Sequence, residues 1–221
     1  GTDTLDFTNL TTTAGVNVTL NTSLAFSSGG TAYTTTVATM ENFTGSGQAD
    51  TIIGNSSANV LNGGAGDDTI DGKAGIDVIN GGAGNDLFTI DFSAIDTIDG
   101  GANSDTVKFN AFTLTNITSD TNFISMNSIT NIEKLDITAL GLTTANPGTE
   151  YKFTDTMIKQ WSGSATGTVS LSLTKAQTDR IMFTDNGGVV HDSAINTAGT
   201  YSYTLQDDGT DGSTTLSLIV S

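Results

Sequence analysis

Large apolar residues recur at every ninth position along the middle of this chain, and this period constrains the fold more than any other feature. The spacing is ten at one step and nine at the others. Self-similarity at a short fixed period is the signature of a repeat architecture, in which each unit packs on its neighbours. The apolar series is Ile52, Leu61, Ile70, Ile79, Phe88, Ile98 and Val107, and the residues two positions earlier are Asp50, Asn59, Asp68, Asp77, Asp86, Asp96 and Asp105.

Glycine-rich turns fill the intervals between these apolar positions. The clearest copies read GGAGDDTID at 63–71 and GGAGNDLFT at 81–89. They resemble the RTX nonapeptide, G-G-x-G-x-D-x-U-x, which winds a parallel β-roll and binds calcium. A flexible linker shares the glycine and acidic composition, but a linker has no reason to place an apolar residue at every ninth position. The repeats therefore predict a β-roll over residues 45–108.

The period also predicts how the turns stack. Each unit is expected to be a six-residue turn followed by a three-residue strand, and two units complete one coil. Turns eighteen residues apart should then lie above one another on the same side of the roll. Asp50, Asp68, Asp86 and Asp105 are expected along one edge, and Asn59, Asp77 and Asp96 along the other.

Stacked turns of this composition suit a hard cation. Ca²⁺ takes six to eight oxygen ligands at about 2.3–2.6 Å, and two turns offer backbone carbonyls together with aspartate carboxylates. The resemblance implies that each ion lies between turns one coil apart. Without metal, carboxylates on strands about 4.8 Å apart repel one another, so metal binding is expected to supply the folding free energy.

We expect roughly three to six calcium ions from the number of turns. The pairs expected to bind best are Asp50/Asp68, Asp68/Asp86 and Asn59/Asp77. The full set of candidate metal-binding residues is Asp50, Asn59, Gly63, Gly64, Gly66, Asp67, Asp68, Gly72, Gly75, Asp77, Gly81, Gly82, Gly84, Asn85, Asp86, Asp96 and Asp105.

The copies of the turn are not equal. The turn at 54–59 lacks two glycines and has the neutral Asn59 where aspartate belongs, which predicts a weak site or none. The segment from Ile90 to Asp99 keeps the aspartate and isoleucine cadence without a glycine turn, so it is expected to continue the roll without a site. In the last turn, 100–105, Asn103 replaces a glycine.

Charge and composition exclude several classes of function. The net charge of −17 opposes binding to nucleic acid and to anionic lipid headgroups. The absence of cysteine excludes a disulfide scaffold, and no apolar run has transmembrane length. No signal peptide is visible, and residues 1–7 resemble the tail of another repeat, so we expect a piece of a longer polypeptide.

The expected fold class is all-β: a parallel β-roll with an irregular N-terminal β-stack extension at 1–44, a β continuation or cap at 109–147, and a C-terminal β-rich domain at 148–221. One or two short helices are expected in that domain, at 154–161 and from Thr174. Strands are expected at 169–173, 181–183, 201–205 and 215–220, with an acidic turn between the last two that is a further candidate calcium site.

The sequence offers no convincing active site. His191 is the only histidine and there is no cysteine, so a zinc site lacks ligands. His191 is expected in a loop. Its neighbours Asp192 and Ser193 do not complete a catalytic triad with it, because adjacent residues in an extended strand would point to opposite faces. The candidate carboxylate pairs all lie in the repeat turns. We therefore expect no enzymatic activity.

The resemblance implies a non-enzymatic, calcium-dependent structural domain of a large secreted bacterial surface protein. The stretch at 131–136 resembles sequences beside the rolls of adhesins and S-layer proteins. An adhesin that folds outside the cell after type I secretion is the first expectation, and an S-layer protein forming a self-assembled surface lattice is the second. A secretion and folding module of an RTX enzyme is the third, and a peptide- or glycan-binding role for 148–221 stays open. The expected partners are calcium, the type I secretion machinery and a host or biofilm surface ligand.

Overall fold

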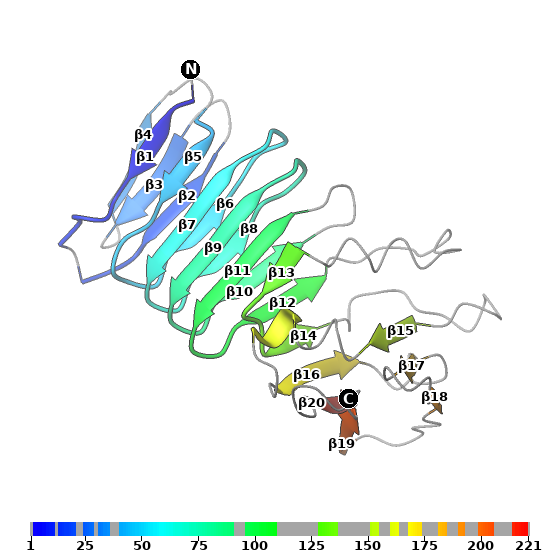
Figure 1. Ribbon diagram of the computed structural model, residues 1–221. Coiled ribbons are helices and arrows are strands. Elements are labelled where there is room, and N and C mark those ends of the chain that lie inside the picture. Colours follow the sequence, from blue (N-terminus) through cyan, green and yellow to red (C-terminus); the bar gives the residue numbers. More distant parts are fainter. Residues whose placement is uncertain are drawn as a thin grey trace. The chain divides into compact units, whose positions relative to one another are not determined.

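The structure is a computed structural model, and it describes most of the first half of the chain and separate strands of the second (Figure 1). The described residues are 2–11, 13–20, 24–28, 31–35, 40–90, 96–109, 128–136, 151–154, 160–163, 168–173, 181–184, 190–192, 199–205 and 214–220. The chain divides into two compact units, Gly1–Lys108 and Phe109–Ser221. The predicted division into four segments stays a prediction.

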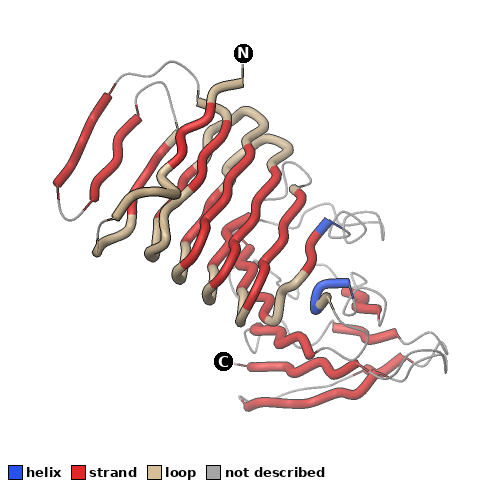
Figure 2. Tube along the Cα trace, turned by 60° about the vertical axis from the view of Figure 1, so that its left-hand side comes forward, coloured by secondary structure: helices blue, strands red, loops and turns tan. Residues whose placement is uncertain are grey.

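The first unit is a parallel β-roll made of two sheets, as the repeats predicted (Figures 1 and 2). One sheet has the order β1 (Thr4–Asp6), β5 (Asn42–Thr44), β7 (Val60–Ala65), β9 (Val78–Ala83) and β11 (Thr97–Ala102), and every neighbouring pair is parallel. The other has the order β4 (Thr31–Thr35), β3 (Leu24–Ser28), β2 (Val16–Thr19), β6 (Thr51–Ile53), β8 (Thr69–Asp71), β10 (Leu87–Ile90) and β12 (Thr106–Phe109).

The apolar residue of each repeat forms the core. In the β6, β8 and β10 ladders, Ile70 stands opposite Ile52 on one side and Phe88 on the other. In the facing sheet, Ile79 stands between Leu61 and Ile98. All six side chains are at most 1 % exposed. Burying one such side chain contributes about 1.5–3 kcal/mol, so each short strand gains stability only by stacking on its neighbours.

The strands of one sheet are longer than predicted. β7, β9 and β11 each span six residues, because the ladder continues through the glycine pair of the following turn. Gly82 stands in register with Gly64 on one side and Gly101 on the other. Three-residue strands, as predicted, occur in β6 and β8. The glycine pairs are therefore part of the sheet on this side of the roll.

The N-terminal segment extends both sheets of the roll. β1 adds to one sheet through β5, and β2 adds to the other through β6, in both cases in parallel. Leu5 falls in the column of Phe43 and Leu61, which places Asp3 at the aspartate position of a repeat. β3 and β4 follow as antiparallel strands at the edge. The irregular β-stack predicted here is thus observed.

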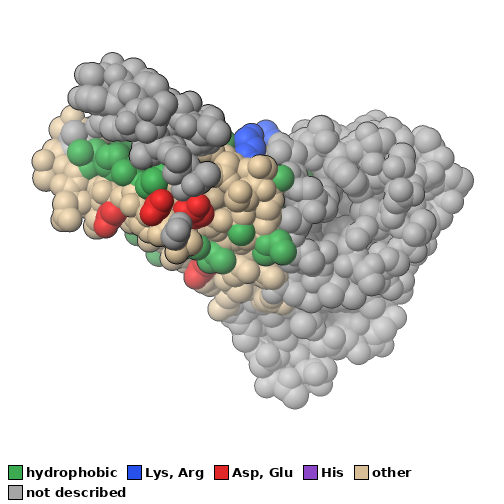
Figure 3. Space-filling model, turned by 90° about the horizontal axis from the view of Figure 1, so that it is seen from above, with side chains coloured by type: hydrophobic (Ala, Val, Ile, Leu, Met, Phe, Trp, Pro, Cys, Tyr) green, Lys and Arg blue, Asp and Glu red, His purple; other side chains and the backbone are tan. Residues whose placement is uncertain are grey.

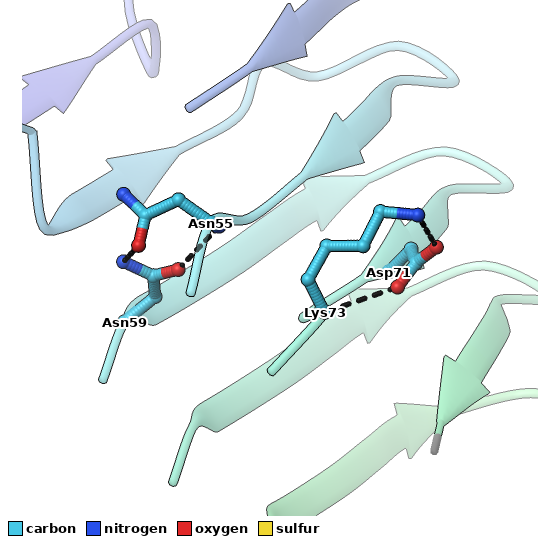
Figure 4. A network of polar contacts seen from close by, with 4 residues as sticks. All are labelled: Asn55, Asn59, Asp71 and Lys73. Atoms are coloured by element: carbon cyan, nitrogen blue, oxygen red, sulfur yellow. Dashed lines mark hydrogen bonds and ion pairs between the residues drawn. The ribbon is translucent and has the colours of Figure 1, made fainter. Parts of the chain in front are cut away.

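One turn of the roll carries a lysine where the repeat has its second glycine. Lys73 has a φ of 65°, and its ammonium and its backbone N–H both contact the Asp71 carboxylate, at 2.7 and 3.0 Å (Figure 4). A side chain in the left-handed region costs about 1–2 kcal/mol, and an exposed ion pair returns about 0–1 kcal/mol. The left-handed backbone at Lys73 therefore lowers the stability of the roll by more than the ion pair restores.

Replacing this lysine with glycine should stabilise the roll. We expect Lys73→Gly to raise the free energy of unfolding by about 0.5–1 kcal/mol relative to Lys73→Ala. Lys73→Ala is the matched control, since it removes the same ion pair and keeps the Cβ atom. Urea unfolding in saturating calcium measures the difference. Equal stability of the two variants would show that the left-handed φ carries no cost here.

The second unit is also rich in strands. β14 (Lys134–Asp136), β16 (Thr168–Leu173) and β20 (Thr214–Val220) are parallel neighbours, and β19 (Gly199–Leu205) is antiparallel to β20. A separate sheet holds β15 (Tyr151–Thr154), β17 (Ile181–Thr184) and β18 (Val190–Asp192), and β13 (Ile129–Thr130) precedes β14. The strands predicted from alternation at 169–173, 181–183, 201–205 and 215–220 are confirmed.

Two local predictions in this unit concern a helix and a histidine, and the second was wrong. Of the helix predicted at 154–161, Thr154 ends β15, residues 160–162 are helical, and the residues between lie outside the described part of the chain. His191 lies in β18 opposite Phe183 and not in a loop, which fits the two valines that precede it in sequence. Trp161 is buried, as expected of a core residue. The predicted helix at Thr174 and the acidic turn between β19 and β20 lie outside the described residues.

Candidate calcium sites in the stacked turns

The aspartates of one edge form a continuous ladder of hydrogen bonds. The backbone N–H of Asp50 donates to Asp68 Oδ1 at 2.7 Å. The N–H of Asp68 donates to Asp86 Oδ1, and the N–H of Asp86 to Asp105 Oδ1, both at 2.8 Å. Each carboxylate therefore accepts the turn amide of the preceding coil, and it does not face another carboxylate directly.

The other edge follows the same rule. The backbone N–H of Asn59 donates to Asp77 Oδ1 at 2.8 Å, and the N–H of Asp77 donates to Asp96 Oδ1 at 2.9 Å. The two series thus stack at the spacing of eighteen or nineteen residues that the sequence predicted. The structure brings together the paired residues of each edge, including Asp96, whose turn lacks glycine.

In the ladder carboxylates of Asp68 and Asp86, one of the two oxygens accepts no hydrogen bond. Asp68 and Asp86 are 1 % exposed, and their Oδ2 atoms are buried and accept no hydrogen bond. Asp77 and Asp105 are buried to the same extent. A buried charged oxygen without a partner costs free energy. The acidic side chains at the surface in Figure 3 are therefore a different set from these ladder aspartates.

The first glycine of each turn leaves a space beside that oxygen. A methyl group on Cα of Gly63 would overlap both Asp68 Oδ2 and the carbonyl oxygen of Gly81, one coil further on. The same is true of Gly81, where the overlap is with Asp86 Oδ2 and the Gly100 carbonyl oxygen. A carboxylate oxygen and a carbonyl oxygen of the next coil therefore both lie close to the place that a side chain would occupy, which only glycine leaves free.

These donors fit a hard cation that prefers oxygen. Among the described residues, no group of three or more Asp, Glu, His or Cys side chains comes together around one point. Carboxylates alone would thus leave Ca²⁺ short of its six to eight oxygens, and turn carbonyls have to contribute. Tetrahedral zinc sites need nitrogen or sulfur ligands, which these turns lack. The buried oxygens and glycine spaces therefore suit calcium.

The remaining candidate residues have distinct positions. Gly64, Gly66, Gly75, Gly82 and Gly84 all have positive φ values and pack on the backbone of the preceding coil. Asp67 and Asn85 are not part of the buried ladder: the N–H of Asn85 donates to Asp67 Oδ1 at 2.7 Å in an exposed position. Gly72 lies beside Asp77 Oδ2, as Gly63 lies beside Asp68 Oδ2.

Sequence reasoning missed the residues that complete the first turns. Ser46 donates its backbone N–H to Asp50 Oδ2 at 2.6 Å and its hydroxyl to the same carboxylate. Asn55 donates its N–H to Asn59 Oδ1 at 2.9 Å (Figure 4). Both stand where the repeat has its second glycine, and this departure from the repeat was the available signal.

Burial changes the acidity of the ladder. Burial raises the pKa of Asp68 to about 7, against an ordinary value of 3.8. The hydrogen bond from the Asp50 N–H opposes this rise, and the nearby charges of Asp50, Asp86 and Asp67 add to it. Burial likewise raises the pKa of Asp86. Near neutral pH the Asp68 carboxyl group is therefore easily protonated when no cation is present.

We expect acid to stabilise the calcium-free roll. The folded-state pKa of Asp68 lies above its unfolded value, so its ionisation opposes folding; this opposition is fully developed above pH 7 and disappears as the pH falls toward 3.8. Urea unfolding in EGTA should therefore give a higher stability at pH 5 than at pH 8. The Asp68→Asn/Asp86→Asn variant is the control, and it should lose much of this dependence. A calcium-free roll that is less stable at pH 5 would contradict the burial of these charges.

The parallel coils and oxygen-lined turns together define a calcium-binding β-roll. A family model for the RTX calcium-binding nonapeptide repeat, in four copies, matches residues 44–79, 63–89 and 93–111. This segment of the chain consists of RTX calcium-binding repeats, as the sequence predicted. No curated protein gave a significant match to the chain.

Proposed function

We propose that the roll is a calcium-driven folding module. The observation that carries this proposal is that Asp68 Oδ2 and Asp86 Oδ2 are buried without hydrogen bonds, and that each lies beside the first glycine of its turn. Bound calcium would neutralise these charges, and the residues that hold it would be the ladder aspartates and the turn carbonyls. The free energy of binding then becomes folding free energy, because the site does not exist in the unfolded chain.

The buried oxygens also give a proposed assignment of ions. Asp68 and Asp86 with their turn glycines would form two sites on one edge. The buried Asp77 beside Gly72 would form one on the other edge, and the buried Asp105 is a further candidate. This lies within the predicted range of roughly three to six ions, which came from the number of turns. Asp50 differs because Ser46 already donates to both of its oxygens. The pair Asp50/Asp68 is therefore a weaker candidate than Asp68/Asp86.

The proposed module acts as a switch between calcium concentrations. Weak extracellular sites have Kd values of about 10⁻⁴–10⁻³ M, and stabilisation grows with the logarithm of calcium concentration over Kd. The repeats would remain unwound at low cytosolic calcium and would wind outside the cell. A chain that stays unfolded inside the cell would suit export by the type I machinery. We therefore propose a secreted location for the folded roll.

We propose an adhesin of the bacterial surface as the parent protein. The repeats support a structural role, and the described helical residues include no segment with the length and hydropathy to span a bilayer. A surface-layer protein and an RTX enzyme with an upstream catalytic domain share the same module. The sequence preceding Gly1 distinguishes the three: tandem adhesive repeats favour the first, and a metalloprotease helix or a nucleophile elbow favours the last.

Titration calorimetry on the EGTA-stripped chain tests the module. We expect calcium to bind with a stoichiometry of about three or more, and the Asp68→Asn/Asp86→Asn variant to lose about two ions relative to the unmodified chain, following the assignment above. Magnesium is the control, and it should bind weakly because it demands a near-ideal octahedral site. Absence of calcium binding, or equal binding of both metals, would contradict the proposal.

A further inference from the structure

The turns of the roll differ along the chain in how their polar groups are satisfied. In the turns ending at Asp68 and Asp86, the second carboxylate oxygen is buried without a hydrogen bond. In the turn ending at Asp50, the corresponding oxygen accepts from the backbone N–H and the hydroxyl of Ser46, at 2.6 and 3.2 Å. The N-terminal turn therefore contains its own donors where the later turns have none.

The first turn on the opposite edge is satisfied by amides. Asn59 Oδ1 accepts the N–H of Asn55 at 2.9 Å, and Asn59 Nδ2 donates to the carbonyl of Glu41 at 3.1 Å. The Asn55 side chain in turn accepts the Ser57 N–H and donates to the Met40 carbonyl. This neutral network joins the turn to the preceding strand, and it contains no carboxylate that a cation would neutralise.

We infer that the turns at 45–50 and 54–59 form a metal-independent end from which the calcium-dependent coils wind. This inference rests on the proposed calcium-driven folding. Ser46 and Asn55 supply there the contacts that calcium would supply in later turns.

The hydrogen-bond direction shows how the next coil would add. The N–H groups of Asp50 and Asn59 point toward the C-terminal side and are accepted by Asp68 and Asp77 of the next coil. A formed N-terminal end therefore presents amide donors to the incoming carboxylates. Each coil added presents the same donors to the coil that follows, as the N–H of Asp68 does to Asp86.

Residue-resolved amide hydrogen exchange on the full chain tests this inference. The reporters of the N-terminal end are the amides of Ser46 and Asn55, which bond within their own turns. The reporters of the later coils are the amides of Leu87 and Thr106, which donate to the carbonyls of Asp68 and Asp86. In calcium all four should be protected. In EGTA at pH 7.5 the first two should exchange at least about ten times more slowly than the last two, relative to their intrinsic rates.

Two other results have separate meanings. Equal loss of protection at all four amides in EGTA would overturn the metal-independent end and leave calcium-driven folding intact. Full protection of Leu87 and Thr106 in EGTA would overturn calcium-driven folding itself, and with it the inference.

A gain of metal dependence provides an independent test. Asn59→Asp removes the amide donor to Glu41 and restores the repeat aspartate. We expect this variant to bind one additional calcium ion in titration calorimetry, and the Asn55 amide to become protected only in calcium. Gln48→Glu is the matched control, because it adds the same charge at an exposed side chain of the neighbouring turn. An Asn55 amide that stays protected in EGTA in the Asn59→Asp variant would contradict the assigned role of the amide network.

Discussion

Replacing Asp68 with asparagine is expected to stabilise the roll without calcium and to destabilise it with calcium. The asparagine oxygen still accepts the Asp50 N–H, as Asp68 Oδ1 does at 2.7 Å, and the buried charge is removed. In EGTA at pH 8 the free energy of unfolding should rise by about 1–3 kcal/mol, the cost of a buried group without a partner. In calcium the loss of one ion should lower it by about 2–3 kcal/mol at a concentration near a hundred times Kd.

The opposite signs are the diagnostic part of this prediction. Denaturant unfolding of both chains in saturating calcium measures the loss of stability. In EGTA, where the unmodified roll is expected to be largely unwound, the β-sheet signal of the two chains in circular dichroism measures the gain. Asp3→Asn is the matched control, because Asp3 is exposed at the aspartate position of the N-terminal unit; it should change stability little in either condition. Destabilisation by Asp68→Asn in both conditions would mean that the carboxylate acts through its hydrogen bond alone.

Adding one methyl group at Gly63 should abolish the stabilisation of the roll by calcium bound at Asp68. The new Cβ atom would overlap Asp68 Oδ2 and the Gly81 carbonyl oxygen, and Gly63 is not among the glycines with positive φ. The effect therefore comes from occupied space and not from backbone strain. We expect Gly63→Ala to lower the free energy of unfolding in calcium by about 2–4 kcal/mol and to weaken calcium binding.

Gly47→Ala provides a control of identical chemistry. No atom lies within 4 Å of a Cβ placed on Gly47, and this glycine has no positive φ. Its replacement should leave calcium binding unchanged and should stabilise the roll slightly, since alanine restricts the unfolded chain. Calcium titration of both variants in parallel measures the contrast. Equal calcium affinity of the Gly63 and Gly47 variants would remove the glycine space from the proposed site.

The sequence predicted the roll because its period records the packing directly. Each repeat buries an apolar residue at the same position, so Ile70 and Ile79 could be assigned to the core without coordinates. The same period predicted that Asp68 stacks on Asp86. Strand length was less predictable. Glycine ordinarily marks a turn, yet Gly64 and Gly82 continue a ladder, because the two backbones lie in register and no side chain separates them.

The differences between turns depended on side-chain detail that the period does not contain. Ser46 and Asn55 looked like losses from the repeat, and only their hydrogen bonds show that they complete their turns. Which carboxylate oxygen remains without a donor is likewise a matter of geometry. In the second unit, alternation predicted β16, β17, β19 and β20. It failed at His191, because the three-residue strand β18 is too short to show an alternating pattern.

Far-ultraviolet circular dichroism of the full chain, first in millimolar calcium and then after excess EGTA, tests the central claim most directly. The claim is that calcium neutralises buried carboxylates between the coils and so makes the roll stable. At pH 8 we predict a β-sheet spectrum in calcium, a large loss of that signal in EGTA, and its recovery when calcium is restored. An identical β-sheet spectrum and an identical unfolding midpoint with and without EGTA would contradict the account.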